Sequence, residues 1–291
     1  MIQLVQAKSI LTKYKEADSW FGIKYSMNIY RGCQHQCIYC DTRSQCYQLV
    51  NFNDNVIIKE NSIRLLEKEL SKLKEINTIG TGSMNDPYTP IEKKYQLTRQ
   101  ALKTISSFNF PIHVITKSDM VLRDIDLLLD IGKVYSAVTI TITTINDELS
   151  KKIEPFAPVS SQRFEAINQL SSSGVYVGIA LMPTLPFITD SPENILAIVE
   201  QAKKVGAQYI IASFGMTLRD KQRDYYFKKI QHLFPEEYSK YKKYYKGEYI
   251  FHSPNNNSLY EMFNKSCSNN SIPTKMKHYT PNLKQLNMFF K

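Results

Sequence analysis

The chain has 291 residues, of which 43% are hydrophobic and 22% charged, which is ordinary globular usage and excludes a disordered or fibrous protein. Its 37 lysines and arginines outnumber 27 acidic residues, giving a net charge of +10, which favours a polyanionic partner or simply a lysine-rich solvated surface. No apolar stretch approaches the roughly 18 residues of a membrane span, and no secretory signal is visible, so we expect a cytoplasmic protein without membrane contact.

In chain order, short β-branched runs alternate with stretches that carry apolar residues at helical spacing. The runs predict strands at residues 25–30, 78–81, 112–116, 135–143, 175–182 and 209–213. The stretches between them predict helices at residues 62–74, 95–108, 119–131, 161–172 and 191–205. This alternation favours right-handed βαβ units and an α/β fold with a parallel sheet, and it leaves an open sheet and a partial barrel as alternatives.

The composition changes after about residue 220, where lysine and tyrosine replace the β-branched runs, as in DYYFKKIQHLFPEEYSKYKKYYKGEY. We interpret residues 221–291 as a helical C-terminal extension packed on a barrel domain of residues 1–220, and not as an independent domain. Lysines for phosphates and aromatic rings for bases would suit a nucleic acid. A helical cap with its tyrosines against the barrel and its lysines in solvent would give the same pattern.

Four of the five cysteines lie close together, directly after the first predicted strand. They are Cys33, Cys37, Cys40 and Cys46, in a loop over residues 31–46. Such clustering in a reducing cytosol indicates a metal or catalytic site, not disulfides. Three converging thiolates would suit a four-iron four-sulfur cluster in which one iron keeps an open position, and open coordination suggests catalysis. The alternative is a closed zinc site that adds Cys46 or His35 as the fourth ligand.

The spacing C-x-x-x-C-x-x-C, with an aromatic residue before the last cysteine, resembles the radical S-adenosylmethionine (SAM) superfamily. The segments NIYRGCQHQCIYCDTR, GSMNDPYTPIEKKYQLTR, VITKSDMVLRD and KKIEPFAP are similar to the spore photoproduct lyase family in particular. This resemblance, over roughly residues 20–215, implies a partial (β/α)6 TIM-type barrel, one [4Fe-4S] cluster, bound SAM, and a flavodoxin or ferredoxin type reductant. It also implies reductive cleavage of SAM to a 5′-deoxyadenosyl radical that abstracts hydrogen from the substrate.

The resemblance further implies roles for individual residues. The cluster ligands would be Cys33, Cys37 and Cys40. The residues at SAM would be Tyr39 beside the adenine, Lys117 at the polar end, Thr141 or Thr143 near the ribose, Met182 through its backbone, and Asn85 and Asp86 at the barrel mouth. Glu154 and Arg163 also match family positions, although an acid and a base so spaced can be a purely structural ion pair.

One departure from the family concerns the return of a hydrogen atom to the substrate. The family carries a donor cysteine at the head of the second-strand loop, where this chain has Ser83. A hydroxyl O–H bond is far stronger than a thiol S–H bond, so photoproduct repair by the known route is not expected. Cys46 and Cys267 are the spare thiols, and Cys267 joins Ser83 as a candidate catalytic residue.

A nucleic acid is the expected substrate, because the net charge, the aromatic residues and the family resemblance agree. A radical enzyme that acts on a peptide or a small metabolite is one alternative. A non-enzymatic zinc protein that binds nucleic acid is the other.

Overall fold

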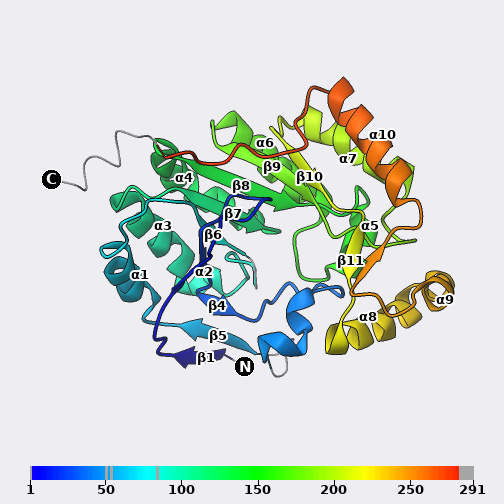
Figure 1. The fold of residues 1–291 in the computed structure, drawn as a ribbon, viewed down its shortest axis with the longest axis horizontal. Helices are drawn as coiled ribbons and strands as arrows, with labels where there is room; N and C mark the ends of the chain where they lie inside the picture. The colour runs from blue at the N-terminus through cyan, green and yellow to red at the C-terminus, as the bar shows by residue number, and fades with distance from the viewer. Residues whose placement is uncertain (1, 50–51, 53–54, 83–84, 282–291) are drawn as a thin grey trace.

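The computed structural model describes residues 2–49, 52, 55–82 and 85–281, and its central feature is a seven-stranded sheet of order β10-β9-β8-β7-β6-β3-β2 (Figure 1). Six neighbouring strands are parallel: β3 (Tyr25–Met27), β6 (Ile79–Thr81), β7 (Ile112–Thr116), β8 (Ser136–Thr141), β9 (Tyr176–Leu181) and β10 (Ile210–Ala212). At one edge β2 (Leu11–Lys13) pairs antiparallel with β3. Within the described strands the two edges do not pair, so the sheet is open and the expected partial (β/α)6 architecture is confirmed.

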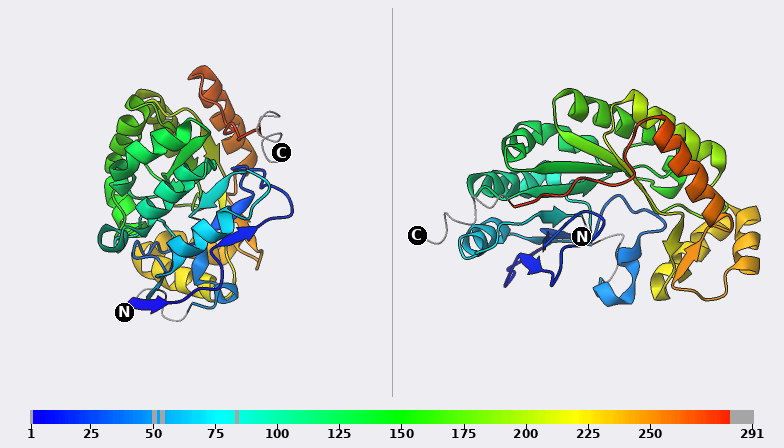
Figure 2. Two further views of the ribbon diagram at one scale, coloured as in Figure 1. Left: turned by 90° about the vertical axis from the view of Figure 1, so that its left-hand side faces the viewer. Right: turned by 45° about the horizontal axis from the view of Figure 1, so that its top comes forward.

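Helices connect the parallel strands and form a layer on one side of the sheet (Figure 2). They are α1 (Ser62–Leu70), α2 (Glu92–Tyr95), α3 (Leu97–Ser107), α4 (Ile125–Gly132), α5 (Asp147–Ile153), α6 (Ser160–Ser172) and α7 (Pro192–Lys204). The five predicted helices are present, although the first turns of the one predicted at 119–131 are a 3-10 helix, Asp119–Asp124. The start of α7 is fixed by Ser191, whose side chain accepts a hydrogen bond from the Asn194 N–H.

The two faces of the sheet differ because side chains alternate along each strand. One face is apolar and buries Val114 and Val138 in a core shared with the helices. On the other face, His113 Nε2 lies 2.7 Å from Thr139 Oγ1, which lies 2.7 Å from the Tyr209 hydroxyl. All three of these polar side chains are fully buried, so the concave side of the sheet is filled by hydrogen-bonded groups below the site described next.

A small second sheet near the N-terminus was not predicted. Its order is β1-β5-β4, formed by β1 (Ile2–Val5), β5 (Val56–Lys59) and β4 (Tyr30–Arg31). The strand predicted at 25–30 is therefore two strands in two sheets, because the chain leaves β3 after Met27. Since β4 leads directly into the cysteine loop, its pairing with β5 fixes where that loop begins.

The C-terminal segment is helical, with α8 (Asp220–Leu233), α9 (Pro235–Tyr244) and α10 (Asn256–Asn269). The sequence did not predict the small antiparallel sheet in which β11 (Gly215–Thr217), before α8, pairs with β12 (Ile250–His252), between α9 and α10. Tyr226 and Tyr241 are fully buried in a cluster that also contains Tyr39 of the cysteine loop. These tyrosines pack inside the protein, as the helical-cap alternative expects.

After α10 the chain returns along the sheet, as the red trace in Figure 1 shows. The Ile210 N–H donates to the Pro273 carbonyl at 2.9 Å, and the Tyr135 hydroxyl donates to the Lys277 carbonyl at 2.6 Å.

No helix in the described part of the chain is both long and apolar enough to span a bilayer.

Candidate functional site

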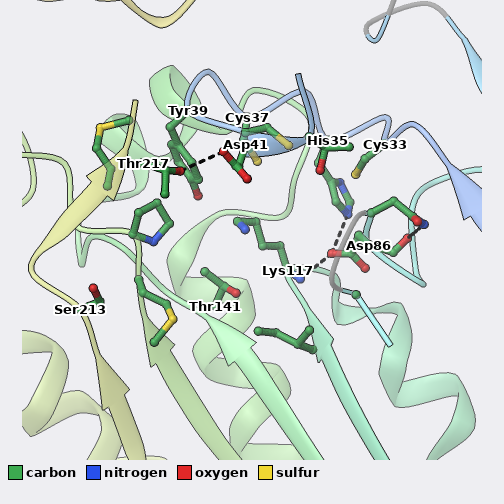
Figure 3. A pocket seen from close by; sticks show the side chains of 18 of the residues that line it. Cys33, His35, Cys37, Tyr39, Asp41, Asp86, Lys117, Thr141, Ser213 and Thr217 are labelled. Carbon is green, nitrogen blue, oxygen red and sulfur yellow. Dashed lines mark hydrogen bonds and ion pairs between the residues drawn. The ribbon is translucent and has the colours of Figure 1, made fainter. Parts of the chain in front are cut away.

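A pocket of about 450 Å³ opens at the carboxyl ends of the parallel strands, beside the cysteine loop (Figure 3). Side chains that are an even number of residues apart on a strand lie on the same face. Lys117, four residues after His113, and Thr141, two residues after Thr139, therefore continue the polar face of the sheet into this pocket. The segment after β10 lines another part of the wall, with Ser213 and Met216. Functional groups from distant parts of the chain therefore meet at the strand ends, the usual position of active sites in this kind of barrel.

Three cysteines line the pocket together. Cys33 and Cys37 are buried and Cys40 is half-buried, whereas Cys46 is exposed and does not line the pocket. Gly32 turns the chain into the loop with φ +87°, and a Cβ there would lie 2.3 Å from the Asn55 carbonyl oxygen. The entry to the loop therefore requires a glycine.

Burial raises the pKa of the Cys33 thiol to about 12, and the nearby Asp86 and Cys40 add to the effect. Burial likewise raises the pKa of Cys37. An isolated thiolate is thus disfavoured at both positions, and a bound metal centre reverses this preference because it supplies positive charge.

The chemistry of these donors fits an iron-sulfur cluster. A single zinc ion needs all its sulfur ligands about 2.3 Å from one point. The cysteines of a [4Fe-4S] cluster bind different irons, so they surround a larger body, and three of them leave one iron without a cysteine.

Tyr39 is held by a chain of buried polar groups. Its hydroxyl donates to the Glu154 carboxylate, and Glu154 Oε2 pairs with Arg163 Nη2 at 2.5 Å, with both side chains fully buried. Arg163 Nη1 donates in turn to the Thr141 carbonyl at 3.0 Å. Glu154 and Arg163, which are similar to family positions, therefore join the cysteine loop to the end of β8 without lining the pocket themselves.

Asp86 joins three segments at the other side of the pocket. Its carboxylate accepts hydrogen bonds from Thr116 Oγ1 at 2.5 Å and from the Lys117 N–H at 2.7 Å. Its Oδ2 also lies 3.4 Å from His35 Nε2. Burial opposes ionisation, but the contacts with His35, Lys117 and Thr116 outweigh it and lower the pKa of Asp86 to about 2. Asp86 is therefore a permanent anion that orients the end of β7.

Lys117 is the cation of the pocket wall. Its Nζ lies 5.6 Å from the centre of the Tyr39 ring. Burial opposes its charge, but attraction to Cys37, once that thiol is ionised, and to the Glu154 carboxylate outweighs burial and raises the pKa of Lys117. A charged lysine beside three sulfur ligands can bind the carboxylate of a ligand.

Other predicted residues are divided between the pocket and the core. Asn85, Thr141 and Met182 line the pocket, and Thr143 is buried outside it. Cys267 lies on α10 in the apolar core and is only 1% exposed, so the structure does not bring it to the pocket. Ser83 lies outside the described residues.

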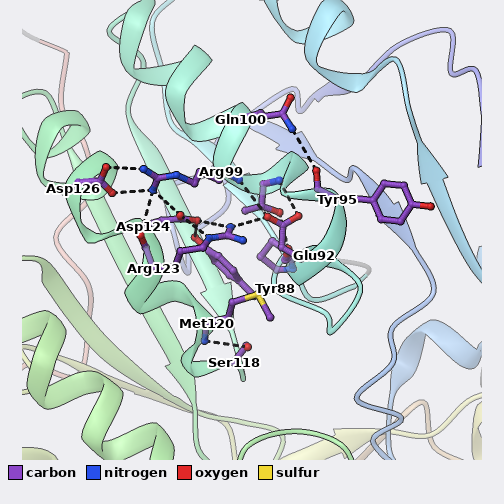
Figure 4. Close-up of polar contacts among 12 residues, drawn as sticks. Tyr88, Glu92, Tyr95, Arg99, Gln100, Ser118, Met120, Arg123, Asp124 and Asp126 are labelled. Carbon is purple, nitrogen blue, oxygen red and sulfur yellow. Dashed lines mark hydrogen bonds and ion pairs between the residues drawn. The ribbon is translucent and has the colours of Figure 1, made fainter.

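The segment GSMNDPYTPIEKKYQLTR carries a buried polar network (Figure 4). The Tyr88 hydroxyl donates to Asp124 at 3.0 Å, and Arg123 pairs with Glu92 at 2.7 Å and with Asp124 at 2.8 Å. Arg99 reaches Asp124 from α3 at 2.9 Å. None of these five side chains lines the pocket, so this network secures the loop that carries Asp86.

Sequence reasoning missed two groups at the site. Asp41, directly after Cys40, accepts hydrogen bonds from Thr217 Oγ1 at 3.0 Å and from Arg219 Nε at 2.9 Å, which joins the cysteine loop to the β11–α8 segment. Trp20 lines the pocket with 45% of its surface exposed. The only signal for Trp20 was that it is the single tryptophan of the chain.

Comparison with known proteins agrees with this geometry. The family model described as the radical SAM superfamily matches residues 27–196. An uncharacterised protein of Methanocaldococcus jannaschii is 37% identical over 173 residues, which are 58% of this chain and 63% of that relative. An uncharacterised protein of Mycobacterium bovis is 28% identical over 84% of this chain and 74% of its own length. A solved structure of spore photoproduct lyase complexed with dinucleoside spore photoproduct shares the fold, with a TM-score of 0.65, 12% identity, and coverage of 92% of this chain and 79% of that one.

Proposed function

This chain belongs to the radical SAM superfamily, and we propose that it is an enzyme that removes a hydrogen atom from a nucleic acid. When bound, a reduced [4Fe-4S] cluster and SAM supply the 5′-deoxyadenosyl radical for this step. The observation that carries the proposal is the single pocket in which three cysteines, Tyr39 and Lys117 meet. In this proposal residues 1–220 form the catalytic domain and residues 221–291 a dependent extension.

We assign the cluster to Cys33, Cys37 and Cys40. Cys46 is left out because it is exposed and outside the pocket. Three cysteines would leave one iron of the cluster without a cysteine ligand, and SAM would bind there. A flavodoxin or ferredoxin type protein would deliver the electron.

For SAM itself, the side chains of the pocket suggest complementary roles. The Lys117 cation suits the carboxylate of the methionine part. The ring of Tyr39, fixed through Glu154, offers an apolar wall for the adenine, beside the backbone of Met182. Of Thr141 and Thr143, Thr141 is the one that lines the pocket, so we assign the ribose contact to Thr141 and not to Thr143. Asn85 and Asp86 complete this wall, Asp86 by orienting Lys117.

We further propose that no thiol of this chain returns hydrogen to the substrate. Three of the five cysteines are assigned to the cluster. Cys46 is exposed outside the pocket, and Cys267 lies on α10 with its side chain buried in the core. Ser83, at the donor position of the family, carries a hydroxyl whose O–H bond is too strong for this purpose. The reaction therefore differs from photoproduct repair in the step that quenches the substrate radical, because no thiol of this chain returns a hydrogen atom to it.

A nucleic-acid substrate is supported by the net charge of +10 and by the exposed lysines of α8 and α9, among them Lys228, Lys240 and Lys243. The spore photoproduct lyase that shares the fold is complexed with a dinucleoside. Because Tyr226 and Tyr241 are buried, these two rings are not available to stack on bases.

The test is anaerobic reconstitution followed by iron and zinc analysis and electron paramagnetic resonance of the reduced protein. We expect iron without zinc, a reduced-cluster signal that changes when SAM is added, and 5′-deoxyadenosine in the supernatant. Zinc without iron would overturn the proposal in favour of a closed metal site. Oligonucleotide binding that weakens as salt rises is expected for a nucleic-acid substrate, and its absence would favour a peptide or a small metabolite.

A further inference from the structure

Trp20 combines two properties that rarely occur together. Its side chain lines the pocket that contains the three cysteines, yet 45% of its surface is exposed. Ile250 of β12, which comes from the C-terminal segment, has the same combination, with 44% exposed. Two large apolar side chains from opposite ends of the chain therefore form part of the mouth of the pocket. Both are exposed to solvent and can contact a ligand that enters the pocket. An exposed apolar surface at such a place is typical of a binding site.

The backbone around Trp20 is fixed before any ligand arrives. The Asp18 carboxylate accepts hydrogen bonds from the N–H groups of Trp20 at 3.0 Å and Phe21 at 2.8 Å. The Trp20 carbonyl lies 3.2 Å from His278 Nε2 of the returning C-terminal segment. Phe21 stacks on His113 of β7, with ring centres 4.6 Å apart and planes 15° apart. A side chain on a backbone fixed in this way loses only its own rotamer freedom when it contacts a ligand.

The position of the reactive groups restricts how a polymer can reach them. Cys33 and Cys37 are no more than 8% exposed, and the space beside them is about 450 Å³. A nucleotide within a strand must therefore leave its stack to approach, and losing the stacking costs free energy. An aromatic face at the mouth replaces the lost stacking, and it does so for any base because every base has a π-face.

We propose that Trp20 is a stacking platform for a nucleobase of the substrate, an inference that rests on the proposed nucleic-acid function. The partner is a single-stranded or locally unpaired nucleic acid, since a paired base cannot present its face to the indole. The net charge of +10 favours this polyanion over a peptide with an aromatic side chain.

The experiment uses the fact that Trp20 is the only tryptophan, so tryptophan emission reports this one position. The reconstituted protein, with SAM present, is titrated anaerobically with a short single-stranded oligothymidylate, and binding is measured separately by anisotropy of a labelled strand. We expect the emission to fall as the strand binds. We expect Trp20→Leu to weaken binding about tenfold or more, in the range measured when stacking rings are removed, and Trp20→Phe to retain most of the affinity.

Tyr14→Ala is the matched control, because Tyr14 is a 38% exposed ring that does not line the pocket; it should bind like the wild type. Failure of the wild type to bind any strand would reject the nucleic-acid function and the platform with it. Binding that leaves both the emission and the Trp20→Leu affinity unchanged would reject only the platform. Equal losses of affinity in Trp20→Leu and Tyr14→Ala would also reject it.

Discussion

Glu154→Gln is expected to destabilise the protein strongly, because it leaves Arg163 buried without a countercharge. Both side chains are fully buried, with Glu154 Oε2 and Arg163 Nη2 2.5 Å apart. Removing one partner of such a pair costs about 3–5 kcal/mol. At roughly 2–4 °C per kcal/mol for a chain of this size class, the melting temperature should fall by about 10 °C.

The matched control is Glu148→Gln on α5, the helix that Glu154 directly follows. Glu148 pairs with Lys151 at 3.5 Å, but the two side chains are 80% and 62% exposed. An exposed pair contributes about 0–1 kcal/mol, so its melting temperature should fall by no more than a few degrees. Thermal unfolding followed by circular dichroism, on protein kept anaerobic, measures both variants.

A second substitution separates the buried charge from the volume of the side chain. Glu154→Gln combined with Arg163→Met removes both charges, and it should recover part of the loss because neither charge then remains buried and unpaired. Similar melting temperatures for Glu154→Gln and Glu148→Gln would refute the reasoning. A double variant whose loss equals or exceeds the sum of the two single losses would refute it as well, because the coupling between the charges would then be absent.

Three further substitutions test the site. Cys37→Ala should lose the iron and the visible absorption of the reconstituted protein while Cys46→Ala keeps both; loss of iron in Cys46→Ala alone would show that the ligands are misassigned. Lys117→Ala should bind SAM at least tenfold more weakly in equilibrium dialysis, with iron content intact, because it removes the cation of the pocket wall; unchanged affinity would reject the carboxylate contact. Arg219→Ala should release iron to a chelator several-fold faster than the wild type, because Asp41 next to Cys40 loses its anchor, while Arg223→Ala, which removes an exposed pair on α8, should not. Equal release rates for these two variants would argue against a role of α8 in holding the loop.

The alternation of strands and helices was readable from the sequence because each signal is local. The β-branched side chains at residues 112–116 favour a strand whatever the tertiary structure around them. The apolar spacing at residues 97–107 favours a helix and depends only on neighbours along the chain. The cysteine motif is local too, since three thiols within eight residues converge in one loop. The fold class, the helical C-terminal segment and the cysteine motif were therefore readable before the structure.

Contacts between distant segments were decided only by the tertiary structure. Sequence similarity left Thr141 and Thr143 both open, and only the packed sheet puts Thr141 at the pocket and buries Thr143. Cys267 and Trp20 show two opposite failures of sequence reasoning. Cys267 was a candidate catalytic residue and lies in the core. Trp20 was not a candidate and lines the pocket. No spacing rule predicts such outcomes, because the exposure of a side chain is set by the elements that pack over it. Here such elements can lie far away along the chain, as His278 does from Trp20, 258 residues away.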